Sequence, residues 1–428
     1  MAPLRYARTP IEIESPEELG YDSISYNLAE SSFADQRLSD YGIDTDVGDL
    51  LLQYGDHLGL PRLRELIAAE SAETGGSDPN GIGPDQVTVT SGAAPALFIV
   101  ATALLGPGDH ALIQAPNYAT NLETPRMLGA DLEHVEIRYE DGWELDVDRL
   151  ASQIRPETKL ISITYPHNPT GAMIDAETLE RIVGLVDDHP TARLLLDETY
   201  RSLAPEPLPL AASLSERDRA LSISSMSKTY GLPGLRMGWI INRDPELAET
   251  LLAAKEQILI CGSTADEEMA ARVLEAKDRI LPPIRAKIDE HLGIVRGWLA
   301  ADDVRDVFEW VEPRAGVVGI PRLRDPDAID IDRFYKTLLE NHGTYVGPGH
   351  WFDQPRSSFR LGFGWPTTDE LHKGLAGLLA AAADAAKYLR GRAAGPRVGA
   401  RRKPPEQRER RPDRNIGAVR GGSAEPPP

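Results

Sequence analysis

The chain has 428 residues, and its 67 Asp and Glu outnumber its 46 Lys and Arg, which gives a formal net charge of −21. This excess of negative charge disfavours general nucleic-acid binding, because the phosphate backbone would repel the protein. No run of eighteen apolar residues predicts a membrane span, and the first residues lack the apolar stretch of a secretory signal. A single cysteine excludes an intrachain disulfide, so we expect a cytoplasmic protein.

Short apolar runs alternate with amphipathic segments through the middle of the chain. The runs that predict strands cover residues 87–92, 110–116, 160–166, 192–200, 220–228 and 234–243. Amphipathic segments between them, such as 176–186, predict helices. Continuous apolar strands separated by helices are typical of a mostly parallel sheet that is covered on both faces. We therefore predict an α/β fold with a large domain over residues 49–282, whose ligand binds beyond the carboxyl ends of the strands.

The pattern changes near Pro282. A long helical stretch (283–301) precedes short strand-like segments, a helix over 331–343 and a closing helix that begins at Thr368. We predict a smaller α+β domain over residues 283–389, which the N-terminal segment 1–48 is expected to join.

The last part of the chain differs from the rest in composition. From residue 390 onward Pro, Gly and Arg dominate, and eleven Lys and Arg stand against four Asp and Glu. Such a segment cannot bury enough apolar surface to offset its ordering entropy. We therefore predict a disordered basic tail over residues 390–428.

The most informative stretch is SISSMSKTYGLPGLRMGW, in which Lys228 follows a strand and lies in a loop rich in Ser, Gly and Pro. A lysine that forms a Schiff base must be fixed at such a place, and its amine must lose its proton readily. Ser225 and Arg236 supply a hydroxyl and a guanidinium, which both suit a phosphate dianion. Each residue alone is unremarkable, but the Ser-x-x-Lys-x7-Arg spacing is much less expected by chance.

This stretch resembles the lysine motif of the class I/II aminotransferases, fold type I enzymes that use pyridoxal 5′-phosphate (PLP). The resemblance extends from about residue 25 to residue 389, and it implies that the large domain binds PLP. It implies that Lys228 carries PLP as an aldimine and then removes the substrate's Cα proton as general base. Asp197 closes the apolar part of the run ARLLLDETY. It would keep the pyridine nitrogen protonated, so that the ring accepts electrons. Tyr200 would reach the cofactor's phenolic oxygen.

Further cofactor contacts follow from the same resemblance. HNPTG resembles the family's Asn-Pro-x-Gly turn, in which Asn168 donates to the phenolic oxygen and contacts the substrate, and whose Asn-Pro peptide is often cis. Gly92, Ala93 and Ala94 lie between a strand and a helix and would place backbone N–H groups against the phosphate. Some family members have Thr, Ser or Gln at the two alanine positions, so this chain departs from the pattern by one side-chain donor.

The remaining expected contacts involve the substrate and a second subunit. Tyr118, in APNY, matches the aromatic residue that stacks on the pyridine ring. Tyr54 resembles the tyrosine that reaches the partner subunit's phosphate, so the active site would require a homodimer. Arg360, in FRLGFGW, matches the arginine that binds the substrate's α-carboxylate as a bidentate fork. No His, Cys or Asp cluster has zinc-site spacing, so no metal is expected.

The motifs leave the outcome of the reaction open. We predict transamination first, in which an amino acid passes through an aldimine and a quinonoid and leaves as a 2-oxo acid. The same intermediate also permits β- or γ-elimination, replacement or ring closure. SKTYGLPGLRMGW and YPHNPTGA are similar to the ring-closing capreomycidine synthases of natural-product biosynthesis. That resemblance keeps an arginine-derived substrate as an alternative.

A second local resemblance concerns the N-terminal part. NLAESS (27–32) and GLPRLR are similar to 1-aminocyclopropane-1-carboxylate synthases, which act on S-adenosylmethionine, and this would place Glu30 near the substrate side chain. A PLP-binding transcription regulator is disfavoured, because only about fifty residues precede Tyr54 and they are acidic rather than a DNA-binding domain. The motifs do not identify the substrate.

Overall fold

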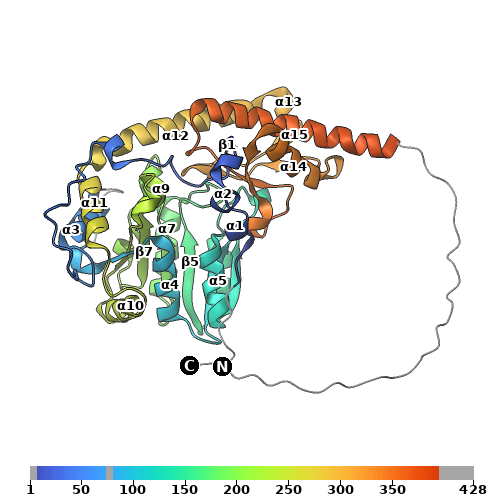
Figure 1. The fold of residues 1–428 in the computed structure, drawn as a ribbon. Helices are drawn as coiled ribbons and strands as arrows, with labels where there is room; N and C mark the ends of the chain where they lie inside the picture. Colours follow the sequence, from blue (N-terminus) through green and yellow to red (C-terminus); the bar gives the residue numbers. More distant parts are fainter. Residues whose placement is uncertain (1–6, 74–80, 395–428) are drawn as a thin grey trace, which may run out of the picture.

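The computed structural model describes residues 7–73 and 81–394, and its centre is a seven-stranded sheet (Figure 1). In spatial order the strands are β2 (Val87–Thr90), β8 (Gly238–Asn242), β7 (Ala220–Ser225), β6 (Arg193–Asp197), β5 (Thr158–Thr164), β3 (His110–Ala115) and β4 (Asp131–Glu136). Only β8 runs antiparallel to its neighbours, and the other adjacent pairs are parallel. The predicted α/β fold with a mostly parallel sheet is confirmed.

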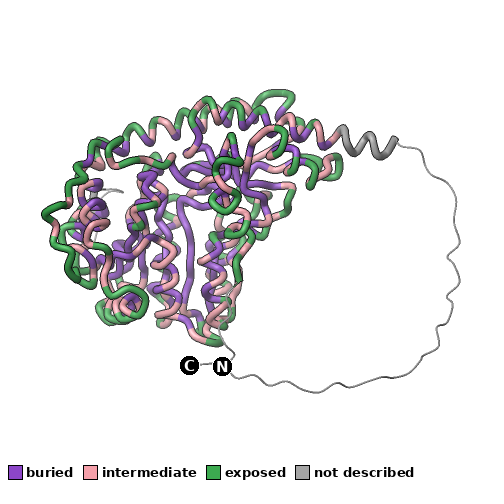
Figure 2. The backbone as a smooth tube through the Cα atoms, viewed as in Figure 1, coloured by how far each residue is buried: buried purple, intermediate pink, exposed green. Residues whose placement is uncertain are grey.

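Helices cover both faces of this sheet. Leu195 shares an apolar cluster with α4 (Ala93–Leu104), α5 (Ala119–Leu128) and α10 (Pro245–Ile258). Leu194 and Leu196 share another with α6 (Val147–Gln153), α7 (Ala176–Asp187) and α8 (Ala211–Leu214). Because successive side chains point to opposite faces of a strand, an unbroken leucine run requires a helical layer on each side. Figure 2 shows the resulting buried layer along the strands.

A second region of helices and short strands lies over the sheet in Figure 1. It contains α13 (Asp302–Arg305), α14 (Ile331–His342), α15 (Thr368–Ala394), β9 (Phe308–Glu309), β10 (Val318–Gly319), β11 (Arg322–Leu323), β12 (Thr344–Tyr345), β13 (Gly347–Pro348) and β14 (Phe359–Gly362). β1 (Tyr26–Asn27) pairs in parallel with β12. This pairing attaches the N-terminal segment, with α1 (Pro10–Ile13) and α2 (Pro16–Leu19), to the second region.

Two predicted boundaries differ from the helices observed. After α3 (Pro61–Glu73) and α11 (Thr264–Glu275), α12 runs from Lys277 to Ala300, so the boundary expected after Pro282 falls inside one helix. The Pro282–Pro283 pair suggested a helix start because proline is favoured in the first turn. α15 continues to Ala394, past the expected start of the tail, and residues 395–428 lie outside the described part. None of the described helices is long and apolar enough to cross a membrane.

The start of β8 approaches the start of α4 so closely that only glycine fits. A Cβ at Gly238 would lie 2.5 Å from the carbonyl carbon of Gly92 and 2.9 Å from the backbone nitrogen of Ala93. These are backbone atoms, so they cannot swing aside as a flexible side chain could. The contact therefore fixes where the N-terminus of α4 lies.

We expect Gly238→Ala to lower the free energy of unfolding by about 1–3 kcal/mol, because the added methyl group overpacks this contact. Thermal denaturation measures the loss. Gly184→Ala is the matched control, since Gly184 lies within α7 and a Cβ there would meet no atom within 4 Å. That change should leave the stability unchanged or raise it slightly. Equal melting temperatures for Gly238→Ala and the parent would show that the contact is not tight.

Candidate active site

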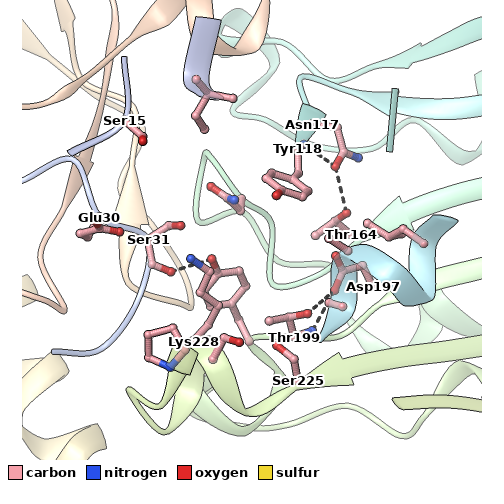
Figure 3. Close-up of a pocket in the computed structure, with 18 of the residues that line it drawn as sticks. Ser15, Glu30, Ser31, Asn117, Tyr118, Thr164, Asp197, Thr199, Ser225 and Lys228 are labelled. Atoms are coloured by element: carbon pink, nitrogen blue, oxygen red, sulfur yellow. Dashed lines mark hydrogen bonds between the residues drawn. The ribbon is translucent and has the colours of Figure 1, made fainter. Parts of the chain in front are cut away.

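A cavity of about 460 Å³ opens at the carboxyl ends of β5, β6 and β7. All but two of the site residues expected from the sequence line it. These lining residues are Glu30, Ala93, Ala94, Tyr118, Asn168, Asp197, Tyr200, Ser225, Lys228, Arg236 and Arg360. Figure 3 shows Lys228 between a wall that carries Glu30 and Ser31 and an opposite wall that carries Tyr118 and Asp197. The exceptions are Gly92, which is in close contact with the guanidinium of Arg236, and Tyr54.

Lys228 occupies a short helix, not the loop expected from its sequence. The helix α9 (Met226–Thr229) follows β7 directly, and Ser225 is its N-cap residue. A one-turn helix leaves too short a pattern to be recognised in a Ser- and Gly-rich segment. The amine of Lys228 has neither a hydrogen bond nor an ion pair with the described residues, and burial lowers its pKa although Glu30 opposes the shift. Lys228 is therefore able to act as a neutral amine.

One end of the cavity is built to hold an anion. Ala93 and Ala94 form the first turn of α4, where backbone N–H groups are not used within the helix. Arg236 donates from Nη2 to the carbonyl of Ser91 at 3.2 Å, and a Cβ at Gly92 would come within 2.5 Å of the same nitrogen. Ser225 also lines this end. A helix N-terminus, a guanidinium and a hydroxyl together suit a phosphate group.

Asp197 is the last residue of β6, and it is 8% exposed. Its Oδ1 accepts hydrogen bonds from the backbone nitrogen and the hydroxyl of Thr199, at 3.0 and 2.6 Å. Burial raises the pKa of Asp197, and no cationic side chain in the described ranges pairs with it. A buried carboxylate in this state is suited to a proton-bearing nitrogen that enters the cavity.

Arg360 crosses from β14 to the loop after β5. Its Nη1 donates to Oδ1 of Asn168 at 3.2 Å, while Nε and Nη2 donate to the carbonyl of Ala29 at 3.2 and 2.6 Å. Each terminal nitrogen keeps one further N–H, and these two form a fork that matches a carboxylate. Arg360 is 4% exposed and makes no ion pair with a carboxylate within the part of the chain that is described.

The contact with Arg360 also orients the amide of Asn168. A guanidinium only donates, so the oxygen of the amide faces Arg360 and Nδ2 faces away, available to donate. The Asn168–Pro169 peptide is cis, as expected. Tyr200 donates its hydroxyl to the carbonyl of Ser31 at 2.7 Å, and burial raises its pKa.

The remaining expected residues differ in placement. Tyr118 is the N-cap residue of α5, lines the cavity and is 36% exposed. Glu30 is half-buried, and burial raises its pKa, whereas Lys228 and Arg360 oppose the shift. Tyr54 is 80% exposed and does not line the cavity of its own chain.

Several lining residues were not expected from the sequence. They are Ile11, Glu12, Ser15, Pro16, Glu17, Ser31, Leu97, Asn117, Thr164, Thr199, Ser227, Pro233 and Trp351. Thr199 was recognisable in principle, because an Asp followed two residues later by Thr is typical of a local hydrogen-bonded turn. The contributions of α1 and α2 had no such local signal.

Comparison with known families decides the affiliation. The model described as "Aminotransferase class I and II" matches residues 34–378. The chain belongs to this family. It is 31% identical to capreomycidine synthase of Streptomyces vinaceus, over 78% of this chain and 82% of that protein. It is 28% identical to arginine–pyruvate transaminase AruH of Pseudomonas aeruginosa, over 70% of this chain and 74% of that protein.

Solved structures agree with this affiliation. A PLP-dependent aminotransferase from Streptococcus suis has a TM-score of 0.77 and 28% identity, covering 87% of this chain and 97% of its own. The PLP-dependent cyclase OrfR has a TM-score of 0.77 and 27% identity, covering 92% and 99%. The chain is thus a fold type I enzyme of the aminotransferase kind.

Pyridoxal 5′-phosphate is the cofactor of this enzyme. The groups present fit it, because the cavity combines an anion site at α4 with the carboxylate of Asp197 and the amine of Lys228, neither of which forms an ion pair with the described residues. These three match a phosphate, a pyridine nitrogen and an aldehyde. In the described ranges no group of three or more His, Cys, Asp or Glu could hold a metal ion.

His167, in the turn that carries Asn168, is buried and held on both sides. Its Nε2 donates to the carbonyl of Pro116 at 2.9 Å, and Nδ1 lies 2.7 Å from the hydroxyl of Thr170. The carbonyl can only accept, so the proton lies on Nε2 and the Thr170 hydroxyl donates to Nδ1. Burial lowers the pKa of His167 to about 3. His167 therefore has a structural role here, as a neutral side chain.

This burial predicts a loss of stability in acid. The pKa of His167 is 6.5 when unperturbed and about 3 in the folded protein. Below pH 6.5 the unfolded chain binds a proton that the folded chain does not, so stability falls by about 2 kcal/mol between pH 6.5 and pH 5. Denaturant titrations should show a shallower fall for His167→Gln, whose amide still donates to Pro116. Parallel pH profiles for the two proteins would contradict this assignment.

Proposed function

We propose that this enzyme is an aminotransferase that moves the amino group of an α-amino acid to a 2-oxo acid. The observation that carries the proposal is the convergence of Lys228, Asp197 and Arg360 on one cavity, where none of the three forms an ion pair with the described residues. When bound, PLP supplies the carbon that takes the substrate's amine and a ring that withdraws electrons from its Cα.

Different residues of the chain bind the substrate, transfer its proton and hold the cofactor. Arg360 binds the α-carboxylate through the free N–H of each terminal nitrogen, which orients the Cα–H bond toward Lys228. The neutral Nζ of Lys228 takes the Cα proton and holds it for return. Asp197 holds the proton on the pyridine nitrogen. Asn168, whose Nδ2 is available to donate, and the hydroxyl of Tyr200 would hold the phenolic oxygen of the cofactor.

The other expected roles complete the binding site. Arg236, Ser225 and the N–H groups of Gly92, Ala93 and Ala94 hold the phosphate. Tyr118 stacks on the pyridine ring. Support for these roles comes from the position of the residues around the cavity and at its anion end.

A second candidate is ring closure, elimination or replacement after the same proton removal. The 31% identity to capreomycidine synthase and the likeness to the cyclase OrfR favour it. These reactions differ from transamination in one respect that can be measured, because they need no 2-oxo acid as amine acceptor. The alternative substrates are arginine derivatives and S-adenosylmethionine.

We also propose a homodimer with shared active sites, in the cytoplasm. Tyr54 is highly exposed, and apolar side chains are exposed near it in two segments, at Leu51, Leu52, Ile258, Leu259 and Ile260. The two segments lie together, because Thr264 donates to the carbonyl of Gln53 and His57 contacts Glu256. An exposed apolar patch of this kind suits a second copy of the chain, whose phosphate site Tyr54 would complete.

The proposed activity is tested by incubating the holoenzyme with a panel of amino acids, with and without 2-oxo acids, and identifying products by mass spectrometry. Transamination predicts amine exchange that requires the 2-oxo acid. Lys228→Ala should lower the rate at least about a hundredfold, because it removes the general base. Lys373→Ala is the control, since Lys373 is an exposed lysine paired with Asp369. Products that form without any 2-oxo acid would replace transamination by the second candidate.

The shared site is tested by mixing two defective subunits. Lys228→Ala and Tyr54→Ala homodimers should each be impaired. A mixed dimer places both substitutions in one site and leaves the other site intact. Random reassociation of equal amounts should therefore restore about a quarter of the parent activity. Activity that does not exceed the mean of the two variants would show that Tyr54 does not act across subunits.

A further inference from the structure

The charges around the cavity do not balance once the expected ligands are assigned. The cationic side chains that line it are Lys228, Arg236 and Arg360. The proposed function assigns each of them to a group of the cofactor or to the substrate carboxylate. The acidic side chains are Glu12, Glu17, Glu30 and Asp197. Asp197 faces the pyridine nitrogen. Three carboxylates therefore remain without an assigned partner.

Glu12 is already engaged at the start of α1. Its Oε2 accepts from the backbone nitrogen of Thr9 at 2.7 Å, as part of a capping box. Among the described residues, the Glu17 side chain makes no ion pair or hydrogen bond, and the Glu30 side chain accepts only from the hydroxyl of Tyr21, at 3.3 Å. These two carboxylates, Glu17 and Glu30, form what we call the carboxylate wall.

The carboxylate wall lies within reach of the reacting end of the cavity. Glu17 and Glu30 both act electrostatically on Lys228 and on Arg360. Glu17 also raises the pKa of Glu30, in the same direction as burial, so the two carboxylates disfavour each other's charge. Two like charges near a buried site are relieved when a cation enters between them.

Apolar groups line the space beside the wall. Ile11, Pro16, Leu97 and Trp351 all contribute to the cavity. These surfaces suit a methylene chain, whereas the carboxylates suit its charged end. In Figure 3 Glu30 lies across the cavity from Tyr118 and Asp197, on the side away from the expected pyridine position. A substrate held by Arg360 would therefore direct its side chain toward this wall.

Glu14 fixes the position of the segment that carries Glu17. The carboxylate of Glu14 accepts from Nε1 of Trp351 at 2.8 Å and contacts Nε2 of His350 at 2.9 Å. Its carbonyl accepts from the hydroxyl of Tyr345 at 2.6 Å. These bonds tie the segment between α1 and α2 to the region that carries Arg360. The distance between Arg360, which is assigned to the α-carboxylate, and Glu17, which is assigned to the end of the side chain, is thus set by these bonds.

We infer that Glu17 and Glu30 select amino acids whose side chain ends in a positive charge, a guanidinium or an ammonium group. The inference rests on the proposed function, in which Arg360 binds the α-carboxylate. A carboxylate discriminates such a group from a neutral isostere because the charged hydrogen bond is stronger. When a neutral side chain binds, the half-buried carboxylate of Glu30 is also left without a cationic partner.

Binding of two non-reacting acids to the holoenzyme tests the inference. The acids are 5-guanidinopentanoate and its neutral isostere 5-ureidopentanoate, which lack the α-amine, and their dissociation constants are measured by calorimetry. We expect the guanidino acid to bind at least about tenfold more tightly. Glu30→Gln should remove most of this preference. Glu17→Gln should reduce it by a smaller factor, because Glu17 is exposed and screened by salt.

Glu18→Gln is the matched control, since Glu18 is the neighbour of Glu17 but does not line the cavity. It should keep the full preference. Amine exchange with arginine and with citrulline gives the second readout, and kcat/KM should show the same ranking among the variants. If Glu30→Gln does not fold, the test compares Glu17→Gln with Glu18→Gln, because Glu17 is exposed and its substitution should not disturb folding.

Four outcomes would overturn the inference. The neutral acid could bind as tightly as the guanidino acid while amine exchange proceeds with neutral amino acids, which leaves the proposed function standing. The preference could persist in both variants, or Glu30→Gln could slow arginine and citrulline equally, and the carboxylates would then not be selective. If neither acid binds and no amino acid exchanges its amine, the proposed function fails together with the inference.

Discussion

The structure depends on three charged groups that lie in one cavity and form no ion pair with the described residues of their own chain. Lys228, Asp197 and Arg360 are all desolvated, and none of them pairs with an opposite charge among the described residues. Groups of this kind cost free energy in an isolated fold, so the surrounding sheet and helices must hold them there. Their charges complement what enters the cavity rather than one another, which is the condition for binding cofactor and substrate strongly.

The sheet and the second region each supply part of this arrangement. Asp197 ends β6 and Lys228 follows the adjacent parallel strand β7, so the distance between them is set by the register of these two strands. Arg360 comes from β14, more than a hundred residues later, and is positioned by Asn168 and the carbonyl of Ala29. The N-terminal segment links the two regions, because the carbonyl of Ala29 accepts from Arg360 and the carbonyl of Ser31 accepts from Tyr200.

The sequence predicted the parts of this site that have a local signature. Lys228, Asp197 and Asn168 each follow an apolar strand, and parallel strand ends meet at one edge of the sheet, so their convergence could be expected. The one-turn helix around Lys228 and the continuity of α12 through Pro282 could not, because tertiary packing overrides such short or ambiguous patterns. The contacts of α1 and α2 could not be predicted from the sequence for another reason. They join residues more than three hundred positions apart, as in the bond from Tyr345 to Glu14.

The residues that the sequence motifs identified and the contacts of α1 and α2 that they did not identify also differ in physical role. Residues at strand ends cannot move without disturbing the sheet, so they suit the chemistry that every substrate must undergo. In the N-terminal segment, Leu28 and Phe33 pack in the core, whereas α1 and α2 lie at the edge of the cavity and are attached through Glu14. A change at Glu17 therefore alters the field in the cavity while the register of the central strands stays the same. In this assignment the N-terminal segment selects the side chain and the strand ends carry the chemistry at Cα, and of the two selecting residues only Glu30 lies in a motif that the sequence made recognisable.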